Sequence, residues 1–381
     1  MENEIPIPKN LKELIEYQYL YPCWLAEKND YLLNEAGRQK RKEILEKRQK
    51  DNLPRDLGYL DLSKLDALEG YFVFLTKEDY AALSPLLFNS IAEKLNINVR
   101  TIYFVGNPED AKIVVDGLKQ DPKYLGGGFG SGWKEQFRYL DEIHPEDADS
   151  INSIIKDKNT GKLIGYNTDI EGFLLPLEKK LKEINNPGFE NKTYIIFGAG
   201  GVGKSLVKEI ARKNPSKIYL VNRTLEKAVK LAEEVNREKE IIMPVSESEF
   251  AEKFLENASE YGKMDVVINT TKKGAGDLED YAAFAPVTNV EENNKKSLEV
   301  AKKLAEINPD VIVYDIALSK SKLSKTLEIA KNAGIRNIIG GENMFLNQAI
   351  CVFKNLEKHN PVFGKLEEEF IKETFYQVIK K

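Results

Sequence analysis

The chain has 381 residues, of which 42% are hydrophobic and 31% charged, with a formal net charge of −5. This length suffices for two domains with separate cores, and the acidic balance argues against nucleic-acid and anionic-membrane partners. Cys23 and Cys351 lie far apart and form no disulfide framework or metal motif, and no apolar run is long enough to span a membrane. We therefore expect a cytoplasmic protein without a metal site.

Residues 1–69 are predicted to form a charged, mainly helical extension. Its basic run, 38–42, is flanked by acidic residues, which favours a solvated helix face over a nucleic-acid patch. We assign this extension no chemistry.

Residues 70–180 alternate strand and helix patterns, which is typical of an α/β domain with a mainly parallel sheet. A glycine-rich stretch, 126–132, is expected to form a loop. Strands are expected at 71–75, 101–105, 152–155 and 162–165, and helices from about 85 and 108. The C-terminal helices, 342–381, which begin near 342 and 365, are expected to join this domain.

Residues 181–341 carry six further strand patterns with helices between them. They lie at 193–197, 217–221, 241–243, 265–269, 311–315 and 337–339. Six strands are the full complement of a dinucleotide-binding domain, so we expect a Rossmann-type fold here.

The first of these strands runs into a glycine-rich turn that fits two phosphate-binding patterns. Gly198, Gly200 and Gly203 match Gly-x-Gly-x-x-Gly, in which a dinucleotide pyrophosphate lies on a helix N-terminus. The same turn matches Gly-x-x-x-x-Gly-Lys-Ser, in which Lys204 would contact the phosphates of a nucleoside triphosphate and Ser205 would bind magnesium.

The residues after the second strand favour the dinucleotide. Asn222, Arg223 and Thr224 follow the strand at 217–221, where this fold contacts the adenosine ribose. An acidic residue there indicates NAD, whereas a guanidinium suits the 2′-phosphate of NADP. We therefore predict NADP as the cofactor. The triphosphate alternative keeps one supporting feature, the strand 311–315 with its terminal Asp315.

From about residue 70 to the end, the chain resembles the shikimate and quinate dehydrogenase family. The matching segments, in family order, are Leu83–Asn89, Trp133–Lys134, Asn152–Ile155, Gly165–Gly172, Val221–Ala228, Val267–Thr271 and Gly341–Gln348. Single matches would be weak, but seven in sequence are specific. The resemblance implies an NADP-dependent oxidoreductase of aromatic amino acid biosynthesis that acts on a ring hydroxyl.

The resemblance also implies that residues 70–180 form the substrate-binding domain, and it implies roles for single residues. Lys134 and Asp169 would be catalytic, with the lysine protonating the oxygen of the ring ketone and the carboxylate orienting the substrate. The predicted substrate-binding residues are Ser84, Asn152, Asn167 and Gln348. The predicted cofactor-binding residues are Gly198, Gly200, Gly201, Gly203, Asn222, Arg223, Thr224, Thr270 and Gly341.

Three places in the expected pocket depart from the family pattern. Ala82 replaces the first serine of a Ser-x-Ser pair, Gly128 and Gly130 replace an Asn and a Thr, and Leu318 replaces a Tyr. Each lost polar partner of a bound hydroxyl or carboxylate would cost about 1–3 kcal/mol. A bulkier or less polar substrate would fit the space released.

Other donors could instead restore the lost contacts. Ser131, Trp133 and the N-terminal extension are the candidates. Three functions thus stay open: a dehydrogenase for a cyclic hydroxy acid or cyclitol other than shikimate, an authentic shikimate dehydrogenase with a rearranged pocket, and a catalytically silent NADP sensor. The expected partners are a small cyclic polyol or hydroxy acid and, as one option, a second copy in a homodimer.

Overall fold

The structure is a computed structural model that describes residues 7–24, 31–47, 57–79, 82–236, 240–319 and 323–379. The chain divides into two compact units, Met1–Thr168 with Ala349–Lys381, and Asp169–Gln348. None of the described helices combines the length and the apolar character needed to cross a membrane.

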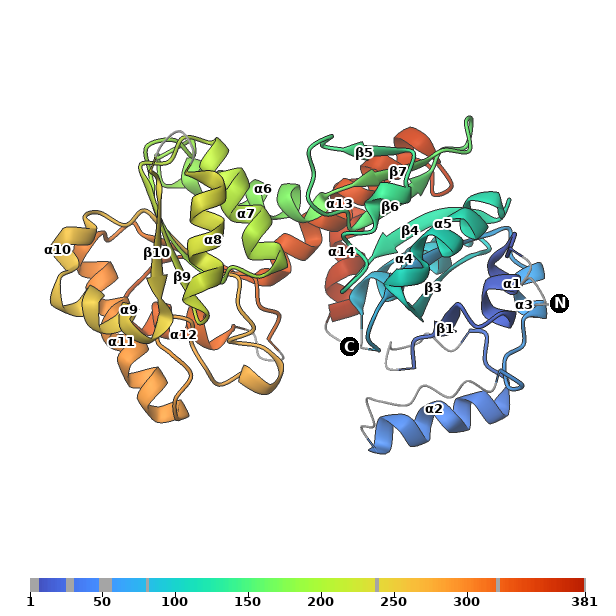
Figure 1. Cartoon of the computed structure of the whole chain (residues 1–381), viewed down its shortest axis with the longest axis horizontal. Coiled ribbons are helices and arrows are strands. Elements are labelled where there is room, and N and C mark those ends of the chain that lie inside the picture. Colours follow the sequence, from blue (N-terminus) through green and yellow to red (C-terminus); the bar gives the residue numbers. More distant parts are fainter. Residues whose placement is uncertain are drawn as a thin grey trace. The chain divides into compact units, whose positions relative to one another are not determined.

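The first unit is built on a seven-stranded sheet with the order β1-β3-β2-β4-β6-β7-β5 (Figure 1). Its strands are β1 (Leu20–Pro22), β2 (Gly70–Thr76), β3 (Val99–Gly106), β4 (Tyr124–Phe129), β5 (Glu142–His144), β6 (Ser153–Lys156) and β7 (Leu163–Tyr166). The pairs β2–β3, β2–β4 and β5–β7 are parallel, and β1–β3, β4–β6 and β6–β7 are antiparallel.

The helices of this unit are α1 (Leu11–Glu16), α2 (Glu35–Lys47), α3 (Ser63–Asp66), α4 (Leu83–Lys94), α5 (Ala111–Gln120) and α14 (Glu368–Ile379), with 3-10 turns η1 (Pro108–Asp110) and η2 (Phe137–Tyr139). Because successive strand residues point to opposite faces, Tyr71, Val73 and Leu75 of β2 share a core with α1 and α5. Phe72 and Phe74 instead contact Phe88 of α4.

The second unit is a six-stranded, wholly parallel sheet with the order β10-β9-β8-β11-β12-β13. Its strands are β8 (Thr193–Phe197), β9 (Lys217–Asn222), β10 (Ile242–Ser246), β11 (Val266–Asn269), β12 (Ile312–Asp315) and β13 (Asn337–Ile339). This is the strand order of the Rossmann fold, so the predicted α/β class with a Rossmann-type domain is confirmed.

Its helices fall into two layers. Those between the strands are α7 (Gly201–Arg212), α8 (Leu225–Val235), α9 (Glu247–Glu256), α10 (Ala258–Tyr261), α11 (Val290–Ile307) and α12 (Lys325–Asn332), with the 3-10 turn η3 (Gly276–Leu278). Two more, α6 (Thr168–Glu183) and α13 (Gly341–His359), cross the boundary of the units. One core joins the sheet to α6, α7 and α8, and another joins it to α9, α11 and α12.

One local expectation needs correction. The stretch expected as a glycine-rich loop begins as strand β4, which pairs with β2 on one side and with β6 on the other. His144 ends β5 and stacks on Tyr166 with ring centroids 5.0 Å apart. The extension, expected to be mainly helical, also contributes strand β1 to the sheet, and its Leu11, Leu14 and Ile15 enter the core.

Candidate active site and cofactor site

The glycine-rich turn lies between β8 and α7 in the second unit. Gly198 has φ 106°, and a methyl group there would lie 2.5 Å from Thr270 Oγ1. A methyl on Gly203 would lie 2.3 Å from the carbonyl oxygen of Gly198. At Gly200 and Gly201, by contrast, it would meet nothing within 4 Å among the described residues outside the turn. The turn is therefore closely packed at its two ends and open in the middle.

The open part is the N-terminus of α7, where backbone N–H groups and the helix dipole favour an anion. Gly200 is the N-cap, and glycine offers no side chain to occupy those donors. The turn thus fits a dinucleotide pyrophosphate.

The nucleoside-triphosphate alternative does not fit the structure. The Lys204 ammonium lies 3.6 Å from the carboxylate of Glu234 on α8, so it is directed along the helix pair rather than over the turn. Ser205 donates weakly to the Gly201 carbonyl, at 3.4 Å, from inside α7. Asp315 is fully buried and accepts hydrogen bonds from Ser324 and from Asn269.

The residues after β9 connect the turn to the next strand. Asn222 Oδ1 accepts the Ala199 N–H at 2.9 Å, and its Nδ2 donates to the Thr224 carbonyl at 2.8 Å. Arg223 and Thr224 are exposed. Asn222 therefore fixes the turn, while the Arg223 guanidinium is free of burial and able to meet a phosphate.

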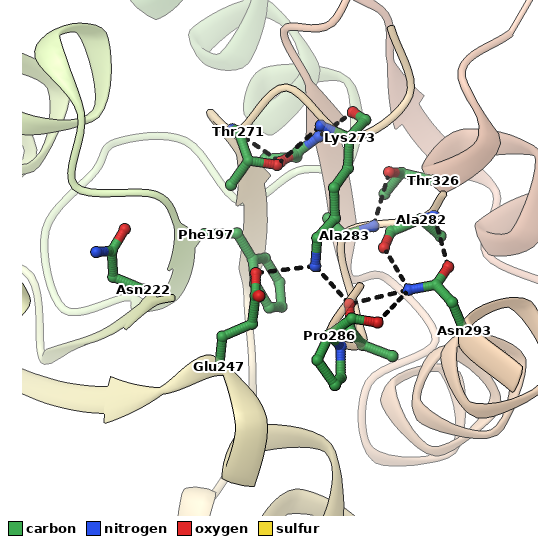
Figure 2. A network of polar contacts seen from close by, with 12 residues as sticks. Phe197, Asn222, Glu247, Thr271, Lys273, Ala282, Ala283, Pro286, Asn293 and Thr326 are labelled. Atoms are coloured by element: carbon green, nitrogen blue, oxygen red, sulfur yellow. Dashed lines mark hydrogen bonds and ion pairs between the residues drawn. The ribbon is translucent and has the colours of Figure 1, made fainter. Parts of the chain in front are cut away.

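A buried ion pair, which the sequence did not predict, joins Lys273 to Glu247 (Figure 2). Lys273 Nζ is 2.8 Å from Glu247 Oε1 and donates to the Ala285 carbonyl, and both side chains are less than a tenth exposed. Burial lowers the pKa of Lys273, Glu247 opposes this, and the Arg223 charge lowers it further. The Ala285 carbonyl belongs to the segment 282–286. Asn293 holds this segment by donating to the carbonyls of Ala282, Ala285 and Pro286.

Thr270 and Gly341 hold the turn and the start of α13. Thr270 Oγ1 donates to the carbonyls of Phe197 and Gly198, at 2.8 and 3.2 Å. A methyl on Gly341 would lie 2.5 Å from the Ile316 carbonyl oxygen. Local packing and hydrogen bonding therefore explain why a threonine and a glycine stand at these two positions. Any contact with a cofactor would be a second role.

In the first unit, three predicted residues lie near the ends of strands: Lys134 after β4, Asn152 before β6 and Asn167 after β7. The Lys134 carbonyl accepts the Ile151 N–H at 2.9 Å, which ties the lysine's turn to the segment before β6. Asn152 Oδ1 accepts the Thr168 N–H at 2.8 Å, and Nδ2 donates to Thr168 Oγ1 at 3.0 Å. The structure thus brings together the segments that carry Lys134, Asn152 and Asn167.

Asn167 presents an unusual buried group. The residue is 8% exposed and its Nδ2 donates to Ser150 Oγ at 3.4 Å, yet its Oδ1 accepts no hydrogen bond from the described residues. An unsatisfied buried acceptor costs about 1–3 kcal/mol. A ligand hydroxyl would remove this cost.

Ser84 is exposed in the first turn of α4, after the N-cap Ala82. Asn89, in the same family segment, exchanges two hydrogen bonds with the backbone of Thr101 and therefore anchors α4 to β3. The serine is available to a ligand, whereas the asparagine is structural.

Asp169 and Gln348 meet within the second unit. Gln348 Nε2 donates to the carboxylate of Asp169, which is 8% exposed. A methyl on Gly172 would lie 2.5 Å from Gln348 Cγ, so only glycine lets α6 and α13 approach this closely. The predicted catalytic carboxylate is thus oriented by a predicted substrate-binding amide.

The departures from the family pattern do not release space at Gly128. A methyl there would lie 2.7 Å from the Phe74 ring and 2.5 Å from the Asn152 carbonyl oxygen. Phe74 and Ala82 also pack in one apolar cluster with Cys23. Trp133 cannot replace the lost donors, because it is fully buried and its indole N–H donates to the Gly106 carbonyl at 3.0 Å. The expectation of a vacant space is therefore wrong at this position, where the wall is apolar and filled.

Comparisons with known proteins agree with these features. Residues 179–274 match the model of the shikimate / quinate 5-dehydrogenase family. The NADP(+) shikimate dehydrogenase of Caldanaerobacter subterraneus subsp. tengcongensis is 32% identical over 296 residues, which cover 76% of this chain and 92% of that protein. That of Methanocaldococcus jannaschii is 30% identical and covers 72% and 86%.

Solved structures show the same fold. The shikimate 5-dehydrogenase of Listeria monocytogenes, in complex with shikimate and NAD, superposes with a TM-score of 0.60 at 22% identity, covering 80% of this chain and 95% of that one. Together with the sequence relatives, this shows that the chain belongs to the shikimate and quinate dehydrogenase family.

Proposed function

We propose that the chain catalyses reversible hydride transfer between NADPH and a ring ketone of a cyclic hydroxy acid or cyclitol other than shikimate. The family supports the reaction class: the chain is an NADP-dependent dehydrogenase that acts on a CH–OH group. One observation supports a substrate ring with several hydroxyl groups. The buried Asn167 Oδ1 accepts no hydrogen bond from the described residues, so a substrate hydroxyl could donate to it.

NADPH supplies the hydride when it is bound. The backbone N–H groups at Gly200 and Gly201 would hold its pyrophosphate, because a side chain at either position would fill the open part of the turn. The exposed Arg223 would pair with the 2′-phosphate. Asn222 and Thr270 would keep the turn in shape through their bonds to its backbone.

Lys134 and Asp169 would act on the substrate. The Lys134 ammonium would give its proton to the ketone oxygen and so limit the negative charge that develops there. Asp169 accepts a hydrogen bond from a neighbouring ring hydroxyl, and Gln348 holds this carboxylate by donating to it. Asn167 Oδ1 would accept a hydrogen bond from a second ring hydroxyl.

The apolar wall supports a substrate other than shikimate. Ala82 and Gly128 remove polar groups where the family binds a carboxylate and hydroxyls, and the Phe74 ring fills the place beside Gly128. Ser84 alone keeps a hydroxyl in the first turn of α4. A ring that is less polar at this end would avoid the cost of unpaired donors.

The test is turnover of shikimate, quinate and myo-inositol with NADP+. Lys134→Ala should lower kcat by about 10²- to 10⁴-fold. Lys112→Ala is the matched control, because this lysine pairs only with Asp116 on the exposed side of α5 among the described residues and should leave kcat unchanged.

The double variant of Lys134→Ala and Asp169→Asn extends the test. If both groups act on one transition state, the loss of kcat in the double variant will be smaller than the two single losses combined, expressed as activation free energies. NADP binding without lysine-dependent turnover of any compound would instead identify a binding protein. A strong preference for shikimate would identify an authentic shikimate dehydrogenase.

A further inference from the structure

The segment Tyr19–Trp24 of the N-terminal extension runs antiparallel to β3. Leu20, Tyr21 and Pro22 lie opposite Gly106, Val105 and Phe104. The register continues into Cys23, whose N–H donates to the Tyr103 carbonyl at 2.7 Å. The segment therefore has one fixed position on the sheet of the first unit.

At one end, this segment is fastened to the loop between β2 and α4. In that loop, Asp79 accepts two hydrogen bonds from the segment. The Cys23 thiol donates to Oδ1, with Sγ 2.6 Å away, and the Trp24 N–H donates to Oδ2 at 2.7 Å. Cys23 is fully buried and packs with Phe74 and Ala82. Hydrogen bonds to a carboxylate are among the stronger ones in proteins, so the extension holds Asp79, just after the end of β2, and packs against Ala82, the N-cap of α4.

At its other end, the segment supports the turn that carries Lys134. A methyl on Gly106 would lie 2.9 Å from Leu20 Cδ2 and 2.9 Å from Trp133 Cζ2, so both side chains pack onto this glycine. Trp133 is fully buried and donates to the Gly106 carbonyl, and Leu20 shares its core. Lys134 is the next residue in the chain.

From these contacts we infer that Tyr19–Trp24 is a positioning element of the substrate site, with Cys23 and Asp79 setting the place of the first turn of α4, which carries Ser84, and Leu20 that of the Lys134 turn. The inference rests on the proposed function. It gives the extension a role, because these six residues supply no group to the chemistry but fix two segments that do.

Two variants test the two ends separately. Asp79→Ala removes both acceptors, so KM for the cyclic substrate should rise about tenfold while Kd for NADP stays within about twofold. Leu20→Ala leaves Trp133 without its neighbour, so kcat should fall about tenfold, since small misplacements of a reacting group are costly. Cys23→Ala should likewise raise KM for the cyclic substrate. Cys23→Ser keeps a donor for Asp79 and should bring KM back close to the wild-type value.

Leu14→Ala is the matched control, because Leu14 is fully buried in the same extension but packs against Gly117 on α5. It should lower the melting temperature as much as Leu20→Ala without changing the ratio of kcat to KM. If Asp79→Ala, Leu20→Ala and Leu14→Ala all lose activity only in proportion to the fall in their melting temperatures, the segment is merely structural and the inference is overturned.

Hydrogen exchange separates this inference from the proposed function. In the full chain, Asp79→Ala should speed amide exchange in 83–89 and Leu20→Ala in 131–136, whereas Leu14→Ala should do neither. If wild-type protein turns over none of shikimate, quinate and myo-inositol, the proposed function fails, and the exchange result still decides whether the extension holds these segments. Unchanged exchange in both variants would overturn it.

Discussion

Substituting two glycines of the β8–α7 turn by alanine separates cofactor binding from folding. Gly200 has φ −81° and ψ −171°, which alanine adopts readily, and its methyl would meet no described atom within 4 Å outside the turn. Gly200→Ala should therefore leave the protein as stable as before, or more stable by about 0.4–1 kcal/mol, because alanine has fewer unfolded conformations to lose.

Gly203→Ala should have the opposite effect. Its methyl would lie 2.3 Å from the Gly198 carbonyl oxygen and 2.6 Å from Thr270 Oγ1, so the start of α7 must move away from the strand. Overpacking of this kind costs about 1–3 kcal/mol. For a unit of this size, a loss of about 2 kcal/mol lowers the melting temperature by about 4–8 °C.

NADP binding provides the second measurement. The methyl of Gly200→Ala would fill the space over the N–H groups of α7, and losing one hydrogen bond to a charged phosphate costs about 1.5–3 kcal/mol, or about 10- to 150-fold in Kd. Thermal unfolding with and without NADP, together with titration of NADPH fluorescence, gives both values. If Gly200→Ala binds NADP as tightly as wild type, the pyrophosphate does not pass over this turn.

Three further variants test other parts of the molecule. Arg223→Asp should weaken NADP binding more than tenfold and transfer preference towards NAD, and an unchanged ratio of the two Kd values would remove the guanidinium from the 2′-phosphate. Glu247→Gln leaves the buried Lys273 charge unpaired and should cost about 3–5 kcal/mol in urea unfolding, whereas the double variant with Lys273→Met should recover most of this loss; equal losses would refute the ion pair. Burial raises the pKa of Asp315 to about 6, so its contribution to stability is present below about pH 4 and is lost as the pH rises through 6. Relative to Asp315→Asn, wild type should therefore lose about 2–3 kcal/mol of unfolding free energy between pH 4 and 7, and a constant difference would contradict the raised pKa.

The second unit followed closely from its sequence. Its six strands begin and end within three residues of the expected positions, and two of them, β8 and β13, coincide with the expectation. The physical reason is that parallel strands covered by helices on both faces need unbroken apolar runs, which punctuating Gly, Asn and Asp residues make easy to delimit. The glycine turn was recognisable for the same reason.

The first unit was less predictable because its sheet depends on contacts between distant segments. Strand β4 consists largely of glycine, and its strand character comes from pairing with β2 and β6, where a methyl on Gly127 would overlap the Val73 carbonyl. Strands β1 and β5 have three residues each, too few for a visible alternation.

The site showed the same division. Family segments predict roles for Lys134, Asn167 and Asp169, but no spacing rule indicates that Phe74 fills the place beside Gly128 or that Asp79 accepts a hydrogen bond from Cys23. Both contacts form only after the chain has folded. The buried Lys273–Glu247 pair was missed because each residue alone resembles an ordinary surface charge.

The pairing of β1 with β3 has a consequence for solubility. Without β1, the outermost strand of the first sheet would be eight residues long, largely apolar, and would present a row of unsatisfied N–H and C=O groups. Such an edge invites pairing with another chain and aggregation. Strand β1, three residues long and ending in a proline that lacks an amide hydrogen, covers Phe104–Gly106 of that edge and is itself a poor template for further growth.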